Sequence, residues 1–299
     1  MNVPIVSYGE IDLDLYLSVN RLPAVNVASS VKQEFSNVGG AAGNTAIWLA
    51  HWGIPVRLLG HELGDDADGI QIREQLARYP MLDSQYVYYR KGEKTPRCQC
   101  LVTPDGERTF ILHGLEDLVV TPLTPEMLEG IRWLNLDMSG PLEPRLEAAR
   151  LAHKQNIPIL VNDIYDLDHP LLGLVDIIIM SAAIMRTKIS NYSVQAFAKA
   201  LHDKAECDVI ITDGIQAVQA FLKTGEQIML RPLQVSVIDT TGAGDIFKAG
   251  LLYGLLQDLP MKQTLKWALA AGAAKVGCAG TTAKPAPLSD IQVLFSQVT

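Results

Sequence analysis

The sequence has few cysteines, and their spacing excludes the common metal and disulfide frameworks. Four cysteines occur in 299 residues, at Cys98, Cys100, Cys207 and Cys278. None belongs to a Cys-x-x-Cys pair, and no histidine stands beside them at metal-ligand spacing, which argues against a structural zinc site. Sparse, unpaired cysteines are typical of reduced thiols inside cells, so we expect a cytoplasmic location.

Long apolar runs, excess positive charge and a dinucleotide-binding fingerprint are also missing. No apolar stretch approaches the length of a membrane span, and the N-terminus lacks a signal-peptide pattern. Lysine and arginine total 25 against 33 acidic residues, and the net charge of −8 disfavours binding to nucleic acid or an anionic membrane. No Gly-x-Gly-x-x-Gly follows the first predicted strand, which disfavours a dehydrogenase.

The sequence does contain a glycine-rich stretch at a predicted strand–helix junction. Residues 239–245 read Asp-Thr-Thr-Gly-Ala-Gly-Asp, between an alternating segment at 233–238 and an apolar segment at 246–256. The free N–H groups of such a helix start, with the helix dipole behind them, form an anion cradle. Gly242 and Gly244 remove the Cβ atoms that would exclude a phosphate. Asp245 supplies a carboxylate where a general base for a substrate hydroxyl belongs.

The alternative for this stretch is an ordinary turn in which Asp245 only caps the helix. Two glycines, two threonines and two aspartates coincide at one junction, however, and this coincidence favours a functional site.

Two further patterns in the N-terminal part indicate substrate contacts. After a predicted strand at 3–9, acidic and apolar residues alternate, which places Asp12 and Asp14 on one face. Their carboxylates suit paired hydroxyl groups, although an exposed edge strand would show the same pattern. Gly39 and Gly40 open a predicted helix that carries Asn44. Taken alone, this second glycine-rich turn is as typical of a close-packed helix start as of a binding loop.

The order of predicted elements indicates the α/β class. Strands at 133–137, 157–161, 175–180 and 209–212 alternate with helices at 143–154 and 193–204. The apolar strands lack polar alternation, which favours a parallel sheet buried on both faces. Ligands bind at the carboxyl ends of such strands, where Ser181 and Thr212 stand. Short strands in about 13–37 and 85–113 predict a small covering sheet, whose free edge leads us to expect a homodimer.

Together these motifs resemble the ribokinase-like (PfkB) family of carbohydrate and nucleoside kinases, over nearly the whole chain. The resemblance implies a single kinase domain over 1–299: a three-layer α/β/α core with a mostly parallel sheet, plus a small β-sheet lid. It makes Gly242, Ala243 and Gly244 the anion hole and Asp245 the catalytic base. The positions that match the family's sugar contacts are Asp14, Gly39, Gly40 and Asn44, with Asp12 where ribokinase has asparagine.

The resemblance also implies ATP and Mg²⁺ as cofactors. Thr212 and Gly214 resemble the family's Thr-x-Gly segment, which touches the nucleotide. The other implied nucleotide contacts are Ser181, Thr241, Gly242 and Gly244. In several members the residues matching Asp239 and Thr241 hold a monovalent cation such as K⁺. The chain departs from the family's Asn-x-x-Glu motif for the Mg²⁺–phosphate network, since Ser181 and Ile184 stand in its place.

The sequence therefore predicts ATP-dependent phosphorylation of a hydroxymethyl group on a sugar or sugar-like alcohol. A nucleoside kinase of the same fold is the enzymatic alternative. A catalytically weak sugar-binding or regulatory homologue is the non-enzymatic one, because Ile184 cannot replace a carboxylate. A phosphosugar kinase is less favoured, since the lid and substrate segments show no basic cluster.

Overall fold

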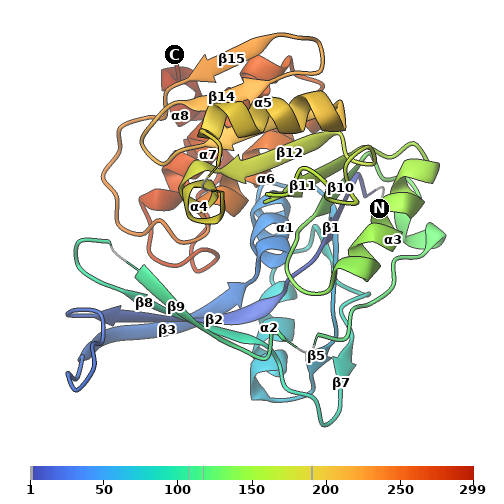
Figure 1. Ribbon diagram of the computed structural model, residues 1–299. Coiled ribbons are helices and arrows are strands. Elements are labelled where there is room, and N and C mark those ends of the chain that lie inside the picture. Colours follow the sequence, from blue (N-terminus) through green and yellow to red (C-terminus); the bar gives the residue numbers. More distant parts are fainter. Residues whose placement is uncertain (1–2, 107, 117, 190) are drawn as a thin grey trace.

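A nine-stranded sheet forms the centre of the computed structural model, which describes residues 3–106, 108–116, 118–189 and 191–299 (Figure 1). In spatial order the strands are β15 (Gln227–Leu230), β14 (Val218–Phe221), β13 (Asp208–Thr212), β12 (Ile177–Ser181), β11 (Ile159–Asn162), β10 (Trp133–Leu136), β1 (Ile5–Tyr8), β4 (Val56–Leu59) and β6 (Leu82–Asp83). Neighbours from β13 to β6 run parallel, and β14 and β15 add an antiparallel edge. The carboxyl ends of the parallel strands therefore share one rim.

Helices cover both faces of this sheet and make it the middle of three layers. In β1, Ile5 faces one apolar core and Val6 the other, as the alternation of strand side chains requires. The first core takes residues from α1 (Ala41–His51), α2 (Ala67–Leu76), α6 (Ala243–Leu256), α7 (Met261–Val276) and α8 (Leu288–Gln297). The second takes residues from the 3-10 helix η1 (Pro125–Leu128), α3 (Leu142–Lys154), α4 (Ala182–Lys188) and α5 (Val194–Ala205). The predicted three-layer α/β fold is confirmed.

A second, four-stranded sheet stands off the core at the lower left of Figure 1. Its order is β3 (Val31–Gly39), β2 (Asp12–Val19), β8 (Arg97–Val102) and β9 (Arg108–His113). A separate two-stranded sheet pairs β5 (Leu63–Gly64) with β7 (Tyr89–Arg90). Because β2 follows β1 and β3 leads directly into α1, the base of the four-stranded sheet adjoins the start of α1.

The segment before the glycine-rich stretch is not the strand that its alternation predicts. Residues 233–238 form no strand, and Val237 and Ile238 are about half exposed. The N–H groups of Ile238 and Asp239 instead donate to the carbonyl of Val276, at 2.7 and 3.3 Å. The loop is therefore fixed by the end of α7 rather than by a sheet. Within the described ranges, no helix has both the length and the apolar character to cross a membrane.

Candidate active site

The glycine-rich stretch ends in the first turn of α6. Gly242 is the N-cap in the left-handed conformation, with φ 71°. A Cβ atom at Gly242 would lie 2.3 Å from Thr281 Cγ2, so both the backbone and the neighbour require glycine. Gly244 is exposed, and a Cβ atom there would meet no described atom within 4 Å. The amide of Ala243 donates to Thr240 O at 3.2 Å, so one of the three predicted anion-hole donors already has an acceptor.

Asp245 lies at the open side of this turn. Its side chain is 20% exposed, and its Oδ2 accepts a hydrogen bond from Asn44 Nδ2 at 2.9 Å. Burial raises the pKa of Asp245, while the Lys248 ammonium and the Asn44 hydrogen bond oppose the rise. Because this carboxylate is both oriented and accessible, it can accept a proton from a hydroxyl that approaches the loop.

The start of α1 positions Asn44. Gly40 is its N-cap with φ 77°, and a Cβ atom there would lie 2.3 Å from Glu10 O. The amide of Gly43 donates to the same carbonyl at 3.2 Å, so α1 begins in direct contact with the chain that leaves β1. Asn44 Oδ1 is buried without a hydrogen-bond partner among the described residues. It is therefore available to a ligand hydroxyl.

Asp12 and Asp14 converge on the backbone of Gly39. A Cβ atom at Gly39 would lie 2.3 Å from Asp12 Oδ1 and 2.4 Å from Asp14 Cγ, which explains the glycine at this position. Both acids are buried, and Asp12 Oδ1 has no hydrogen-bond partner in the described chain. Burial raises the pKa of Asp14 to about 7, and that of nearby Glu10 to about 7 as well. An unpaired, buried carboxylate oxygen is a strong acceptor for substrate hydroxyls.

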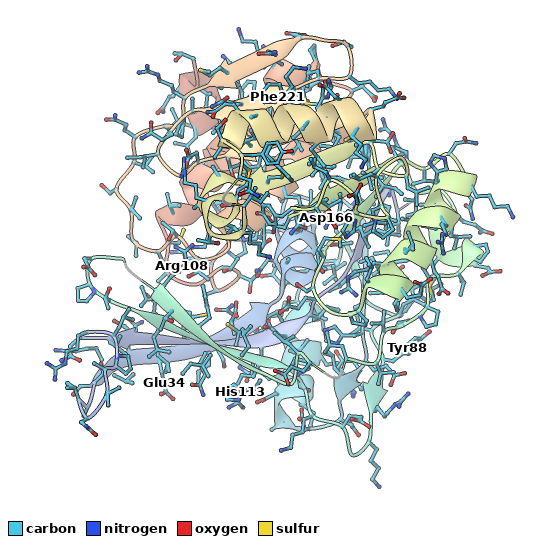
Figure 2. The ribbon with its side chains drawn as sticks, in the orientation of Figure 1. Glu34, Tyr88, Arg108, His113, Asp166 and Phe221 are labelled. Carbon is cyan, nitrogen blue, oxygen red and sulfur yellow. The ribbon has the colours of Figure 1, made fainter. Side chains whose placement is uncertain are left out.

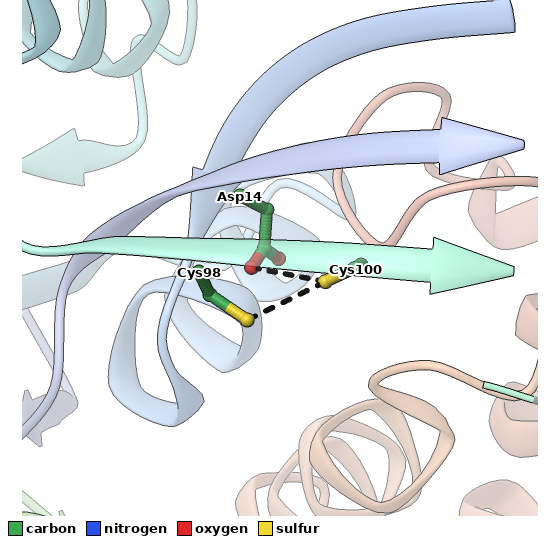
Figure 3. A group of neighbouring side chains, drawn as sticks. All are labelled: Asp14, Cys98 and Cys100. Atoms are coloured by element: carbon green, nitrogen blue, oxygen red, sulfur yellow. Dashed lines mark hydrogen bonds between the residues drawn. The ribbon is translucent and has the colours of Figure 1, made fainter. Parts of the chain in front are cut away.

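Two cysteines of β8 lie beside Asp14 (Figure 3). Cys98 is the register partner of Asp14, and Cys100 follows on the same face. The Cys100 thiol donates to Asp14 Oδ1 at 3.6 Å, and the two sulfur atoms are 3.5 Å apart. Cys100 and Cys98 thus lower the pKa of Asp14 against the larger effect of burial. The sequence pattern did not reveal that these thiols border the acidic pair.

The remaining predicted nucleotide contacts lie on the rim of the sheet. Ser181 and Thr212 are the last residues of β12 and β13 and pair in register. Ser181 Oγ accepts from Ile184 N at 3.4 Å and so caps α4, while Thr212 Oγ1 donates to Met180 O at 3.3 Å. Gly214 has φ 57° and open space at its Cβ position. Ser181 and Thr212 are therefore neighbours on the rim, whereas Asn44 is the predicted acceptor contact that touches Asp245.

Lys248 contacts the predicted base, and the sequence analysis did not anticipate it. Lys248 is buried, and its Nζ lies 3.9 Å from Asp245 Oδ1 and donates to Asn162 Oδ1 at 3.2 Å. A lysine three positions after Asp245 shares its helix face, so a charged residue within an apolar helix was the available signal. Asn162 ends β11, and no local pattern connects it to α6.

Asp239 anchors the loop from beneath. It is fully buried, and its Oδ1 and Oδ2 accept from the amides of Thr241 and Gly280, at 2.8 and 2.9 Å. Lys275 Nζ lies 3.5 Å from Asp239 Oδ2. Thr241 Oγ1 is buried and unpartnered within the described residues.

The start of α6 has open space at Gly244 beside an oriented carboxylate, and this arrangement on a three-layer α/β fold is typical of a phosphotransferase with an alcohol acceptor. The family model for pfkB family carbohydrate kinases matches residues 4–288, and the chain belongs to this family.

Known proteins of the same kind match along the full chain. An ATP-dependent ribose-1-phosphate kinase of Halopiger xanaduensis is 26% identical over 302 residues, covering 98% of each chain. The structure of Arabidopsis thaliana ribokinase complexed with ribose and ATP has a TM-score of 0.82 at 21% identity, covering 99% of each chain. A putative ribokinase II from E. coli in complex with ATP and Mg²⁺ has a TM-score of 0.81 at 18% identity, covering 99% of each chain.

Proposed function

We propose that the chain is an ATP-dependent kinase that phosphorylates a hydroxymethyl group of a neutral sugar or sugar-like alcohol, with Asp245 as general base. One observation carries this proposal: Asn44 donates to the Asp245 carboxylate beside the open position at Gly244, and, after burial, the charge of Asp245 contributes to the raised pKa values of Asp12 and Asp14. A hydroxyl oriented by those acids would reach the base and the phosphate cradle together.

The residues of the site divide the reaction between them. Asp245 takes the hydroxyl proton as the oxygen attacks, and the amides of Gly242 and Gly244 stabilise the charge on the transferred group. One such donor is worth roughly 3 kcal/mol in comparable sites. ATP supplies the phosphoryl group and Mg²⁺ neutralises its charge. The open space at the Cβ positions of Gly214 and Gly244 supports a nucleotide site there, for which Ser181, Thr212 and Thr241 are the further proposed contacts.

The charge around the acceptor supports a neutral substrate. Glu10, Asp12, Asp14 and Asp245 surround this end of the site, and burial raises the pKa of each. An anionic acceptor, such as a sugar phosphate or sugar acid, would need a compensating basic cluster here, and the described residues around these acids do not form one. Free sugars and nucleosides both satisfy this condition, so a nucleoside kinase remains the second candidate.

The four-stranded sheet is proposed to act as a lid and as a dimer surface. All six residues of its edge strand β9 are exposed, from Arg108 to His113, which are both labelled in Figure 2. Within the strand, Phe110, Ile111 and Leu112 form an apolar run. An exposed apolar edge of this kind favours pairing with a second copy. Light scattering of the wild type against Ile111→Lys tests the homodimer, which the lysine should weaken.

An ADP-release screen over pentoses, hexoses, sugar acids and nucleosides, with Mg²⁺ present, identifies the acceptor. Asp245→Asn should reduce turnover on that acceptor by about 10²–10⁴-fold, because the amide cannot take the proton. Calorimetry should show acceptor binding largely retained. Asp258→Asn, just beyond α6, is the matched control and should keep wild-type rates. Near-native turnover by Asp245→Asn would reject the base assignment. ADP release with a small polyol would reject the non-catalytic alternative, which the loss of a carboxylate at Ile184 motivates.

A further inference from the structure

The ammonium group of Lys275 lies in a cage of oxygen atoms under the glycine-rich loop. Lys275 Nζ donates to Asp239 O at 2.9 Å, to Cys278 O at 3.2 Å and to Asp239 Oδ2 at 3.5 Å. The side chain is fully buried. Three acceptors match the three N–H bonds of a protonated amine, whereas a neutral amine offers two. Burial lowers the pKa of Lys275, but the Asp239 carboxylate opposes the fall, and the three acceptors fit the protonated amine.

These oxygen atoms are also those that a free monovalent cation would use. The family resemblance implies such an ion beside Asp239 and Thr241, and backbone carbonyl oxygens are the ligands that K⁺ takes in proteins. In this chain the carbonyl and Oδ2 of Asp239 already face a positive charge fixed to α7. A free cation at the same oxygens would meet that charge at close range, so the residues present do not fit a bound K⁺.

We propose that the Lys275 ammonium takes the place of a monovalent cation, so that the chain holds its anion-binding loop in order without K⁺. Asp239 accepts hydrogen bonds from the amides of Thr241 and Gly280. Thr281, the next residue, lies so close to Gly242 that a Cβ atom there would clash with it. Lys275 thus stabilises the Asp239 carboxylate, and Asp239 in turn fixes the backbone at Thr241 and Gly280, the residues that precede the N-cap Gly242 and its neighbour Thr281. Lys275 is a positioning residue. Its effect on turnover rests on the proposed kinase function, whereas its effect on the loop does not.

The first test uses the wild-type chain in matched potassium, ammonium, sodium and choline salts. The thermal unfolding midpoint and the ADP-release rate should be the same in all four. A rise of the midpoint or a several-fold activation specific to K⁺ would overturn the proposal. The midpoint gives a decision even if no acceptor is found, so failure of the kinase assignment and failure of this inference are distinguishable.

The second test removes the ammonium with Lys275→Ala. The variant should unfold roughly 10 °C lower in choline, because Asp239 is left buried and unpaired. Potassium or ammonium ions should restore part of the midpoint and of the rate, since they can enter the vacated cage. Lys266→Ala is the matched control: Lys266 is on the same helix and donates to Val298 O, away from the loop.

Each remaining outcome is decisive. A folded Lys275→Ala chain that matches the wild type in every salt, or one that is impaired and not rescued by either ion, would overturn the proposal. In those cases Lys275 would serve only as an ordinary buried ion-pair partner. If the variant does not fold, the salt series on the wild-type chain decides alone.

Discussion

Replacing Gly244 by alanine separates folding from phosphate binding at this site. The position lies in the first turn of α6 with an ordinary helical backbone, and the added methyl group would meet no described atom within 4 Å. Alanine in place of glycine at a compatible position stabilises a protein by about 0.4–1 kcal/mol. We therefore expect the unfolding midpoint of Gly244→Ala to stay constant or rise by about 1–3 °C.

The turnover of Gly244→Ala, by contrast, should fall. In the proposed mechanism, the methyl group would occupy the open space at Gly244 through which the phosphoryl group approaches the N–H groups of Gly242 and Gly244. If the group loses even one of these donors, transition-state stabilisation falls by about 3 kcal/mol, which corresponds to a loss of roughly 10²-fold in kcat. The loss should appear in kcat with the acceptor identified by the screen.

The assay pairs ADP release with thermal unfolding on the same preparations. Gly277→Ala is the control: Gly277 also has ordinary backbone angles, and its nearest contact would be 3.5 Å from Ala274 O. That variant should keep wild-type kcat. Wild-type kcat in a folded Gly244→Ala chain would show that no phosphoryl group passes the turn, and the assignment of the anion cradle would be refuted.

Three further predictions follow from buried charge and backbone strain. Lys248→Met removes a cation 3.9 Å from Asp245, an attraction on the order of 1–4 kcal/mol, so the acid limb of the kcat/KM–pH profile should move to higher pH; an unmoved limb contradicts this. Gly242→Ala should lose roughly 2–4 kcal/mol in urea unfolding, because its left-handed backbone and the Thr281 contact both oppose a Cβ atom. Burial raises the pKa of Asp14 to about 7 in the folded chain, against about 3.9 for an exposed aspartate, so its contribution to stability is complete below about pH 4 and is lost as the pH rises to about 7. The thermal unfolding midpoint of Asp14→Asn should therefore rise relative to that of the wild type as the pH increases from 4.5 to 8. A difference between the two midpoints that does not change with pH contradicts this.

Much of the fold could be predicted because the core strands are encoded locally. An apolar run without polar alternation, such as Ile177–Ser181, is buried on both faces and has no stable alternative to a central parallel strand. The segment at 233–238 alternates apolar and polar residues and was therefore predicted to be a strand. It forms none, because no neighbouring strand pairs with it. Its amides are satisfied by Val276 O, and nothing in the local pattern identifies that distant acceptor.

The segment at 86–89, which falls in the range expected to supply strands of the small sheet, shows the same limit. Residues 86–89 have the composition of a strand, yet only Tyr89 belongs to one, and β7 pairs with β5 instead of the four-stranded sheet. The Arg57 guanidinium lies 5.2 Å from the ring centroid of Tyr86, a tertiary contact that accounts for that side chain without a sheet. The residues at 86–89 have a local tendency to form a strand, but tertiary contacts determine which of them join a sheet.

The site was predictable where backbone geometry requires a residue type. Gly242 and Gly40 have left-handed backbones at helix starts, and glycine-rich turns indicate such positions directly. The hydrogen bond between Asn44 and Asp245 joins positions 201 residues apart, so only the family resemblance could bring them together. Lys275 gave no signal, because a lysine in the last turn of a helix is ordinarily a solvated partner of the helix dipole.

Two buried lysines partner the carboxylates at the glycine-rich loop. Lys275 Nζ lies 3.5 Å from Asp239 Oδ2 and Lys248 Nζ lies 3.9 Å from Asp245 Oδ1, so each carboxylate has a cation from a neighbouring turn or helix. Asp12 Oδ1, by contrast, is buried without a hydrogen-bond partner among the described residues. In the proposed reaction a neutral polyol would bind beside Asp12 through its hydroxyls, and the polyanionic donor would lie at the loop, where the lysines offset the carboxylate charge. This arrangement would set the direction of transfer.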